Sequence, residues 1–186
     1  MALRHYQCAH NQREALKIVL WRSKGEFWGM ASPLAIDAAV DDTPKVGNYA
    51  YLTMLHETGH ALGLKHPQDV QGSFGVMPAD RDSLEYSVMS YRSYIGASTT
   101  TGYTNAADSY PQTLMMYDIL ALQTMYGANY TTNAGDTVYR WSTSTGEMSI
   151  NGVGQGASTT NTIFATLWDG GDNLTEILLI YAVFID

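Results

Sequence analysis

The chain has 186 residues, of which 45% are hydrophobic and 15% are charged, a balance typical of a folded globular protein. Ten basic residues against eighteen acidic ones give a formal net charge of -8, which disfavours binding to nucleic acid. One cysteine excludes an intrachain disulfide, and no apolar run reaches the roughly 20 residues of a membrane-spanning helix. We therefore expect one compact domain with no nucleic-acid partner and no membrane span.

The first part of the chain, up to residue 47, carries few structural signals. A weak helical pattern lies at 14 to 21, and the sequence GEFWG at 25 to 29 predicts a strand that leads into a loop. The short apolar stretch at 18 to 21 has charged neighbours and no small-residue cleavage site after it. It therefore lacks the features of a signal peptide, and export would need another route.

A strong helix is expected at about residues 49 to 62. Asn48 is a residue type that caps helix N-termini, and Gly63 suits the left-handed conformation that commonly ends a helix. Between them, apolar or small residues recur at spacings of three and four, at Leu52, Leu55, Gly59 and Leu62.

The chain from 67 to 112 is rich in Gly, Ser, Thr, Asp and Tyr without a sustained period, which predicts long loops. The compact sequence YSVMSY at 86 to 91 interrupts them. A second helix is expected to open at Pro111 and to end at Gly127. Most of its apolar residues are expected along one face, at Leu114, Tyr117, Ile119, Leu122 and Tyr126.

The C-terminal part of the chain predicts strands. Short β-branched or aromatic runs lie at 137 to 141, 162 to 168 and 177 to 185, between Gly-, Ser- and Thr-rich turns. Two low-complexity stretches, 97 to 108 and 142 to 162, predict flexible surface loops.

The sequence HETGHALGLKHP at 56 to 67 predicts a metal site. His56 and His60 are four residues apart on the expected helix, so both imidazoles project from one face. Gly63 allows the sharp turn that would bring His66 back toward them. Three histidine ligands and one open position are typical of a catalytic zinc site, where water takes the fourth place.

Glu57 follows the first of these histidines and points to the flank of the same helix face. From there its carboxylate can reach a water molecule beside the metal without binding the metal, which makes it a candidate general base. Zinc would supply an activated nucleophile and polarise a carbonyl, the two needs of amide hydrolysis. The alternative is that these histidines merely lie on a helix face or are core residues whose hydrogen bonds are satisfied.

The string HExxHxxGxxH is the zinc signature of the metzincin metallopeptidases, and the chain resembles that family. Its LKHP ending, together with SVMSY at 87 to 91, is similar to the serralysin branch. The resemblance implies that Met89 lies in a turn beneath the zinc, and that Tyr91 binds zinc at rest and then stabilises the oxyanion. Ordinary core packing is the alternative for both residues.

The resemblance covers about residues 47 to 171. It implies that Asp118 is structural, and that a calcium ion lies between the segment near residue 135 and the sequence WDGGDN. The calcium ligands so implied are Asn133, Gly135, Thr137, Asp169, Gly171 and Asp172. A solvated Asp-Gly turn is the alternative.

The fold class expected is α+β: a metzincin-like catalytic domain with an active-site helix, a Met-turn and a second helix, followed by short strands that begin a β-roll. Residues 1–141 would form the metallopeptidase domain, and 142–186 a short β-rich segment. The resemblance implies a secreted, monomeric endopeptidase that acts on proteins or peptides, with zinc as cofactor and calcium as a second ion.

Two departures from the serralysin pattern leave other readings open. Only 55 residues precede His56, and the apolar sequence LTEILLIYAVFID stands where acidic, glycine-rich calcium repeats are expected. Truncation at either end is one hypothesis. The rival functions are a catalytically inactive zinc-binding fragment and a calcium-binding β-roll module.

Overall fold

The computed structural model describes residues 2–4, 43–71, 73–171 and 177–183. This part mixes two helices with two three-stranded antiparallel sheets, which confirms the expected α+β class. The elements are β1 (Ala2–Arg4), α2 (Tyr49–Ala61), α3 (Met116–Tyr126), β2 (Tyr139–Trp141), β3 (Met148–Ile150), β4 (Val153–Gly154), β5 (Thr162–Trp168) and β6 (Ile177–Val183). Neither described helix is long and apolar enough to cross a bilayer.

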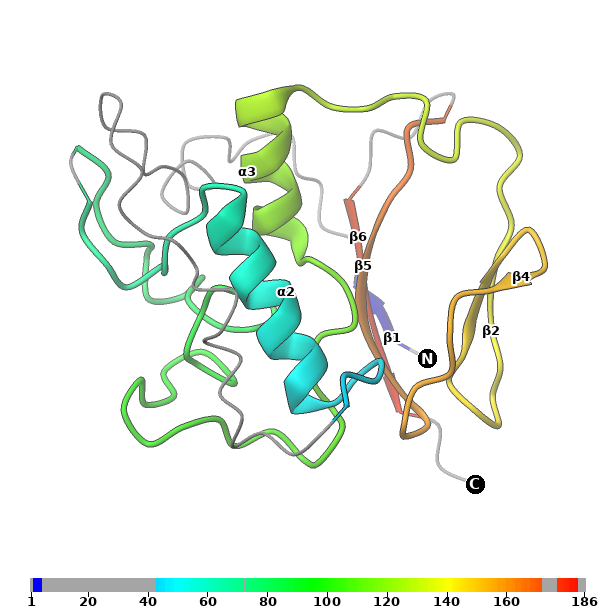
Figure 1. Cartoon of the computed structure of the whole chain (residues 1–186), viewed down its shortest axis with the longest axis horizontal. Coiled ribbons are helices and arrows are strands. Elements are labelled where there is room, and N and C mark those ends of the chain that lie inside the picture. Colours follow the sequence, from blue (N-terminus) through cyan, green and yellow to red (C-terminus); the bar gives the residue numbers. More distant parts are fainter. Residues whose placement is uncertain (1, 5–42, 72, 172–176, 184–186) are drawn as a thin grey trace.

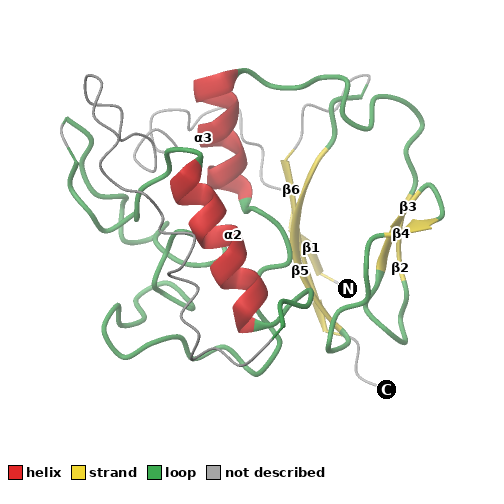
Figure 2. Cartoon of the chain, viewed as in Figure 1, coloured by secondary structure: helices red, strands yellow, loops and turns green. Residues whose placement is uncertain are grey.

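Helices and sheets form successive layers (Figure 1). The helices α2 and α3 lie beside the sheet β1-β6-β5, and the small sheet β2-β3-β4 lies on its other side (Figure 2). In the central sheet, β5 and β6 pair over seven residues, from Thr162 opposite Val183 to Trp168 opposite Ile177. The helical layer and its loops therefore lie on one side of the central sheet.

Strand β5 is buried on both faces because it lies between these layers. Phe164 packs into the main core with residues of both helices and of the loops. Its neighbours Ile163, Ala165 and Leu167 face the second sheet and pack against Tyr139, Trp141 and Met148. Two-sided burial explains why the sequence of this strand is almost continuously apolar.

Helix α2 forms as the sequence predicts, one residue shorter. The Asn48 side chain accepts a hydrogen bond from the backbone N–H of Tyr51 at 2.9 Å, which confirms the N-cap. At the other end Gly63 has a φ of 96°, and the N–H of Leu64 donates to the carbonyl of Gly59 at 2.9 Å. This reversal turns the chain back along the helix toward the metal-binding face.

Helix α3 begins at Met116, so the prediction that it opens at Pro111 is wrong. The intervening residues instead bond to β5: the N–H of Gln112 donates to the carbonyl of Phe164 at 2.8 Å, and the Thr113 hydroxyl accepts from the N–H of Thr166. These bonds to the sheet replace the first helical turn. The end of the helix at Gly127 is confirmed.

The expected strands are found, with shifted bounds. β5 agrees with its prediction, β2 begins two residues late, and β6 is described as far as residue 183. The prediction of a loop throughout 142–162 is wrong, because β3 and β4 form a hairpin there. The pattern of apolar residues in this stretch does not indicate these two strands. The strand expected at 25–29 lies outside the described residues.

The long loops expected between 67 and 112 are confirmed for the part that is described. Hydrogen bonds between polar side chains hold these loops in place. The buried Asp82 carboxylate accepts from the Ser90 hydroxyl at 2.6 Å and from Nε of Arg92 at 2.9 Å, on either side of Tyr91. This loop is therefore fixed close to the helix face that carries the histidines.

Candidate metal centre and cleft

Two histidines of α2 are held by backbone carbonyls. Nδ1 of His56 lies 2.8 Å from the carbonyl oxygen of Val88, and Nδ1 of His60 lies 2.9 Å from that of Leu64. A carbonyl oxygen can only accept, so both Nδ1 atoms carry the proton. In the neutral form of either ring, Nε2 therefore keeps a free lone pair.

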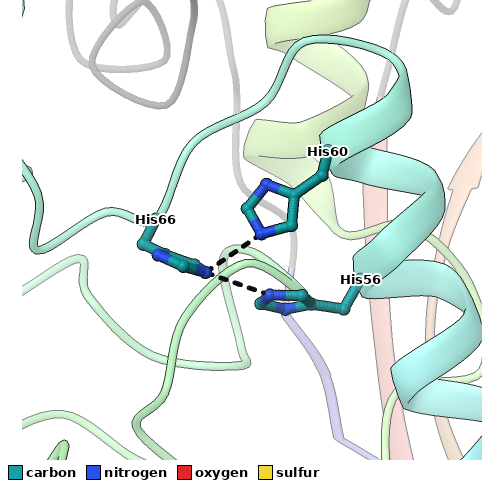
Figure 3. A group of neighbouring side chains, drawn as sticks. All are labelled: His56, His60 and His66. Atoms are coloured by element: carbon teal, nitrogen blue, oxygen red, sulfur yellow. Dashed lines mark hydrogen bonds between the residues drawn. The ribbon is translucent and has the colours of Figure 1, made fainter. Parts of the chain in front are cut away.

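The third histidine comes from the loop that follows the helix. Nδ1 of His66 lies 2.9 Å from a carboxylate oxygen of Asp69, so its Nε2 also presents a lone pair. That Nε2 is 3.1 Å from Nε2 of His56 and 3.0 Å from Nε2 of His60 (Figure 3). The convergence that the sequence predicts for these three residues is present.

Three lone pairs this close would repel one another unless a cation lay between them. Burial lowers the pKa of His56 to about 4 and also lowers the pKa of His66, which favours the neutral form of these two rings. Tetrahedral zinc with nitrogens at about 2.0 to 2.1 Å places its ligands about 3.3 Å apart. The two distances from Nε2 of His66 are close to this value, and the three ligand atoms all lie within 4.8 Å of one another. The residues present fit a zinc ion held through three Nε2 atoms.

Glu57 and Tyr91 flank this centre. Glu57 is half-buried and lines the same cleft as His56 and Tyr91. The Tyr91 hydroxyl lies 2.9 Å from Nε2 of His66, and its ring stacks on His56 with centroids 5.7 Å apart. Burial raises the pKa of Tyr91, and the charges of Asp69 and Glu57 raise it further, so its hydroxyl stays protonated and can donate.

Met89 lies beneath the histidine face. Its side chain is fully buried and its sulfur packs against Gly59 of α2, where an added Cβ would collide with Sδ. Glycine at this position of the helix therefore lets the turn at 86–90 approach the helix closely. The same turn supplies the Val88 carbonyl that orients His56.

Asp118 ties this turn to α3. Its fully buried carboxylate accepts from the Ser87 hydroxyl at 2.6 Å, from the N–H of Val88 at 2.8 Å and from the N–H of Met115 at 2.9 Å. Burial raises the pKa of Asp118 to about 6, against the effect of these three donors. Its contacts are those of an anchor beneath the site, as expected from the sequence.

A cleft of about 530 Å³ opens beside the metal centre. The cleft is lined by His56, Glu57 and Tyr91 of the centre. It is also lined by Tyr49, Tyr103 and Tyr110, whose rings contact one another at centroid distances of 5.6 to 6.0 Å. The sequence analysis missed these tyrosines and Asp69. The spacing of a carboxylate three residues after the last histidine could have revealed Asp69.

The residues predicted to bind calcium are partly brought together. An added Cβ at Gly171 would lie 3.4 Å from the N of Gly135 and 3.6 Å from the carbonyl oxygen of Asn133, so the two segments adjoin. The Asp169 carboxylate accepts from the N–H of Gly171 and from the hydroxyl of Tyr139, both at 2.8 Å. Thr137 donates to Asn133, and Asp172 lies outside the described residues.

The described domain is thus an α+β fold with three clustered histidines that could hold a metal ion, and with a carboxylate and a phenol beside them. No protein-family model matches the chain. It is 36% identical to Metalloprotease AprA of Pseudomonas entomophila (strain L48) over 159 residues, which are 82% of the chain and 31% of that protein.

A second relative agrees with the first. The chain is 40% identical to Serralysin of Proteus mirabilis over 144 residues, which are 74% of the chain and 27% of that protein. The chain is therefore serralysin-like in sequence. It spans less than a third of the length of these curated relatives.

Proposed function

We propose that the chain is a zinc-dependent endopeptidase domain. The observation that carries the proposal is the convergence of three Nε2 atoms, from His56, His60 and His66, beside a cleft that Glu57 also lines. The names of the relatives, Metalloprotease AprA and Serralysin, point to the same class of activity.

Each residue of the centre has a role in this proposal. When bound, zinc would lower the pKa of a water molecule to about 7 and polarise a carbonyl. Glu57 takes the proton of the attacking water and passes it to the leaving amine, acting as general base and then as acid. Tyr91 donates a hydrogen bond to the carbonyl oxygen as negative charge develops there.

The cleft suits a peptide substrate. Its volume and its wall of tyrosines offer space and apolar surface for a side chain next to the bond that is cleaved. We propose that the substrates are proteins or peptides and that the enzyme is secreted and monomeric. We also propose that calcium binds as a second ion, at Asn133, Gly135, Thr137, Asp169, Gly171 and Asp172.

The turn at 87–91 is proposed to serve as the Met-turn of a metzincin, with Met89 supporting the imidazoles and Gly63 allowing His66 to return. Residues 1–141 are proposed as the catalytic domain, and 142–186 as a β-rich segment related to the start of a β-roll. The packing of Met89 against Gly59 supports the first of these assignments.

Two alternative functions remain to be tested beside the endopeptidase. A catalytically inactive zinc-binding domain would keep the histidines but hydrolyse nothing. A calcium-binding module would depend on Asp169 and be indifferent to Glu57.

A casein-cleavage assay separates these functions. The wild type, Glu57→Gln and the matched control Glu147→Gln are compared with and without a zinc chelator. The endopeptidase proposal expects cleavage by the wild type and the control only, and expects the chelator to abolish it. Cleavage that survives Glu57→Gln contradicts the proposal, and zinc binding without any cleavage supports the inactive domain.

A further inference from the structure

His66 is the metal-centre histidine that no helix holds in place. His56 and His60 are fixed by the geometry of α2, whereas His66 lies five residues beyond its last residue, Ala61. A loop residue loses more conformational freedom when it joins a fixed centre, so its position must be secured by specific contacts.

The neighbouring Lys65 makes such contacts. This lysine is only 4% exposed, which is unusual for a charged side chain. Its ammonium group donates to the carbonyl oxygen of His66 at 3.1 Å and to that of Asp69 at 2.6 Å. These two hydrogen bonds of the ammonium therefore hold residues 65–69 in a turn around the lysine side chain.

Asp69 completes the arrangement through its side chain. Its carboxylate accepts from Nδ1 of His66 at 2.9 Å, and its backbone N–H donates to the His66 carbonyl at 3.2 Å. The lysine thus holds the backbone of Asp69, and Asp69 holds the ring of His66. The charges of Asp69 and Asp82 also favour the buried ammonium, which burial alone would disfavour.

We propose that Lys65 and Asp69 form a clamp on His66 that sets how tightly the centre binds and retains zinc. The inference rests on the proposed function in taking zinc as the metal. Both are positioning residues, since each acts on the ion only through the backbone or the ring of His66. Partners of metal-bound histidines orient the ring and raise its basicity, and their loss typically weakens metal binding by about 10 to 100-fold.

Zinc affinity, measured by competition with a chromogenic chelator, tests the clamp without any reference to hydrolysis. Lys65→Met keeps the side-chain length and removes the charge, and Asp69→Asn keeps the shape and removes the carboxylate. Their matched controls are Lys45→Met, at an exposed lysine, and Asp80→Asn, at an exposed aspartate. We expect each clamp variant to bind zinc about 10 to 100-fold more weakly than its control.

A His66→Ala background separates positioning from general stability. If the clamp acts through His66, adding Lys65→Met or Asp69→Asn to His66→Ala produces no further loss of zinc affinity. An equal loss with and without His66 contradicts the clamp, even where the thermal stability of the metal-free protein falls.

Three further outcomes are decisive. Asp69 is half-exposed, so Asp69→Asn is expected to fold where Lys65→Met does not, and zinc affinity equal to that of Asp80→Asn overturns the proposal. A wild type that binds zinc but leaves casein intact removes the endopeptidase function and leaves the clamp standing. A wild type that binds no zinc removes both.

Discussion

The helical and strand sides of the molecule are built in different ways. On the helical side the site depends on contacts between distant residues, such as His56 with Val88 and Ser87 with Asp118. On the other side, β2, β3 and β4 pair with their neighbours in sequence, and β2 and β3 pack on β5. The candidate zinc site therefore lies on the helical side, while the strand side supports β5 and, through it, the core.

The largest effect is expected at Tyr91. Tyr91→Phe removes the hydroxyl that would stabilise the oxyanion and keeps the ring that stacks on His56. Loss of one oxyanion donor typically lowers kcat by about 10² to 10³-fold, so steady-state kinetics on a fluorogenic peptide should show a fall of that size. Unchanged kcat in Tyr91→Phe would remove Tyr91 from the reaction.

A smaller effect, on the stability of the whole domain, is expected at Asp118. Asp118→Ala leaves three buried donors without an acceptor, on Ser87, Val88 and Met115. We expect the free energy of unfolding of the metal-free protein to fall by about 3 kcal/mol, as measured by urea denaturation. Asp136→Ala, at an exposed position, is the control. Equal stability of the two variants would show that the anchor beneath the site contributes little.

The strand side should respond to calcium and not to zinc. Calcium at about ten times its Kd would stabilise the wild type by about 1.4 kcal/mol. Thermal unfolding with and without calcium should show this gain in the wild type and its loss in Asp169→Asn. A gain of the same size in Asp169→Asn would place calcium elsewhere, and no gain in the wild type would remove the second ion.

The smallest effect is expected in the wall of the cleft. Tyr49 is 43% exposed and contacts the rings of Tyr103 and Tyr110. Tyr49→Ala should raise KM by about 3 to 10-fold with little change in kcat, because an aromatic contact contributes about 0.5 to 1.5 kcal/mol. Tyr94→Ala, at another exposed tyrosine, should leave KM unchanged; equal values for the two variants would exclude Tyr49 from substrate binding.

The metal centre could be predicted because its geometry is local. His56 and His60 share a helix whose capping residue and apolar spacing are visible in the sequence, and Gly63 marks the turn that returns His66. Three tyrosines of the cleft could not be predicted in this way. Tyr49, Tyr103 and Tyr110 meet only after the loops fold over the helix, and no period in the sequence links them.

The fold was predictable where one physical cause dominates. Burial on both faces gives β5 a mostly apolar or β-branched sequence, TIFATLW, and its bounds follow from that run. At Pro111 two causes compete, because proline favours the first turn of a helix while Gln112 bonds to Phe164 of the sheet. The hairpin of β3 and β4 is too short and too rich in glycine to produce an alternating pattern.

X-ray absorption at the zinc edge, on protein loaded with one equivalent of zinc, tests the central claim most directly. The account predicts one tightly bound ion with three imidazole nitrogens, and two in His66→Ala. A wild type whose zinc has fewer than three imidazole ligands, or a His66→Ala spectrum identical to that of the wild type, would contradict it.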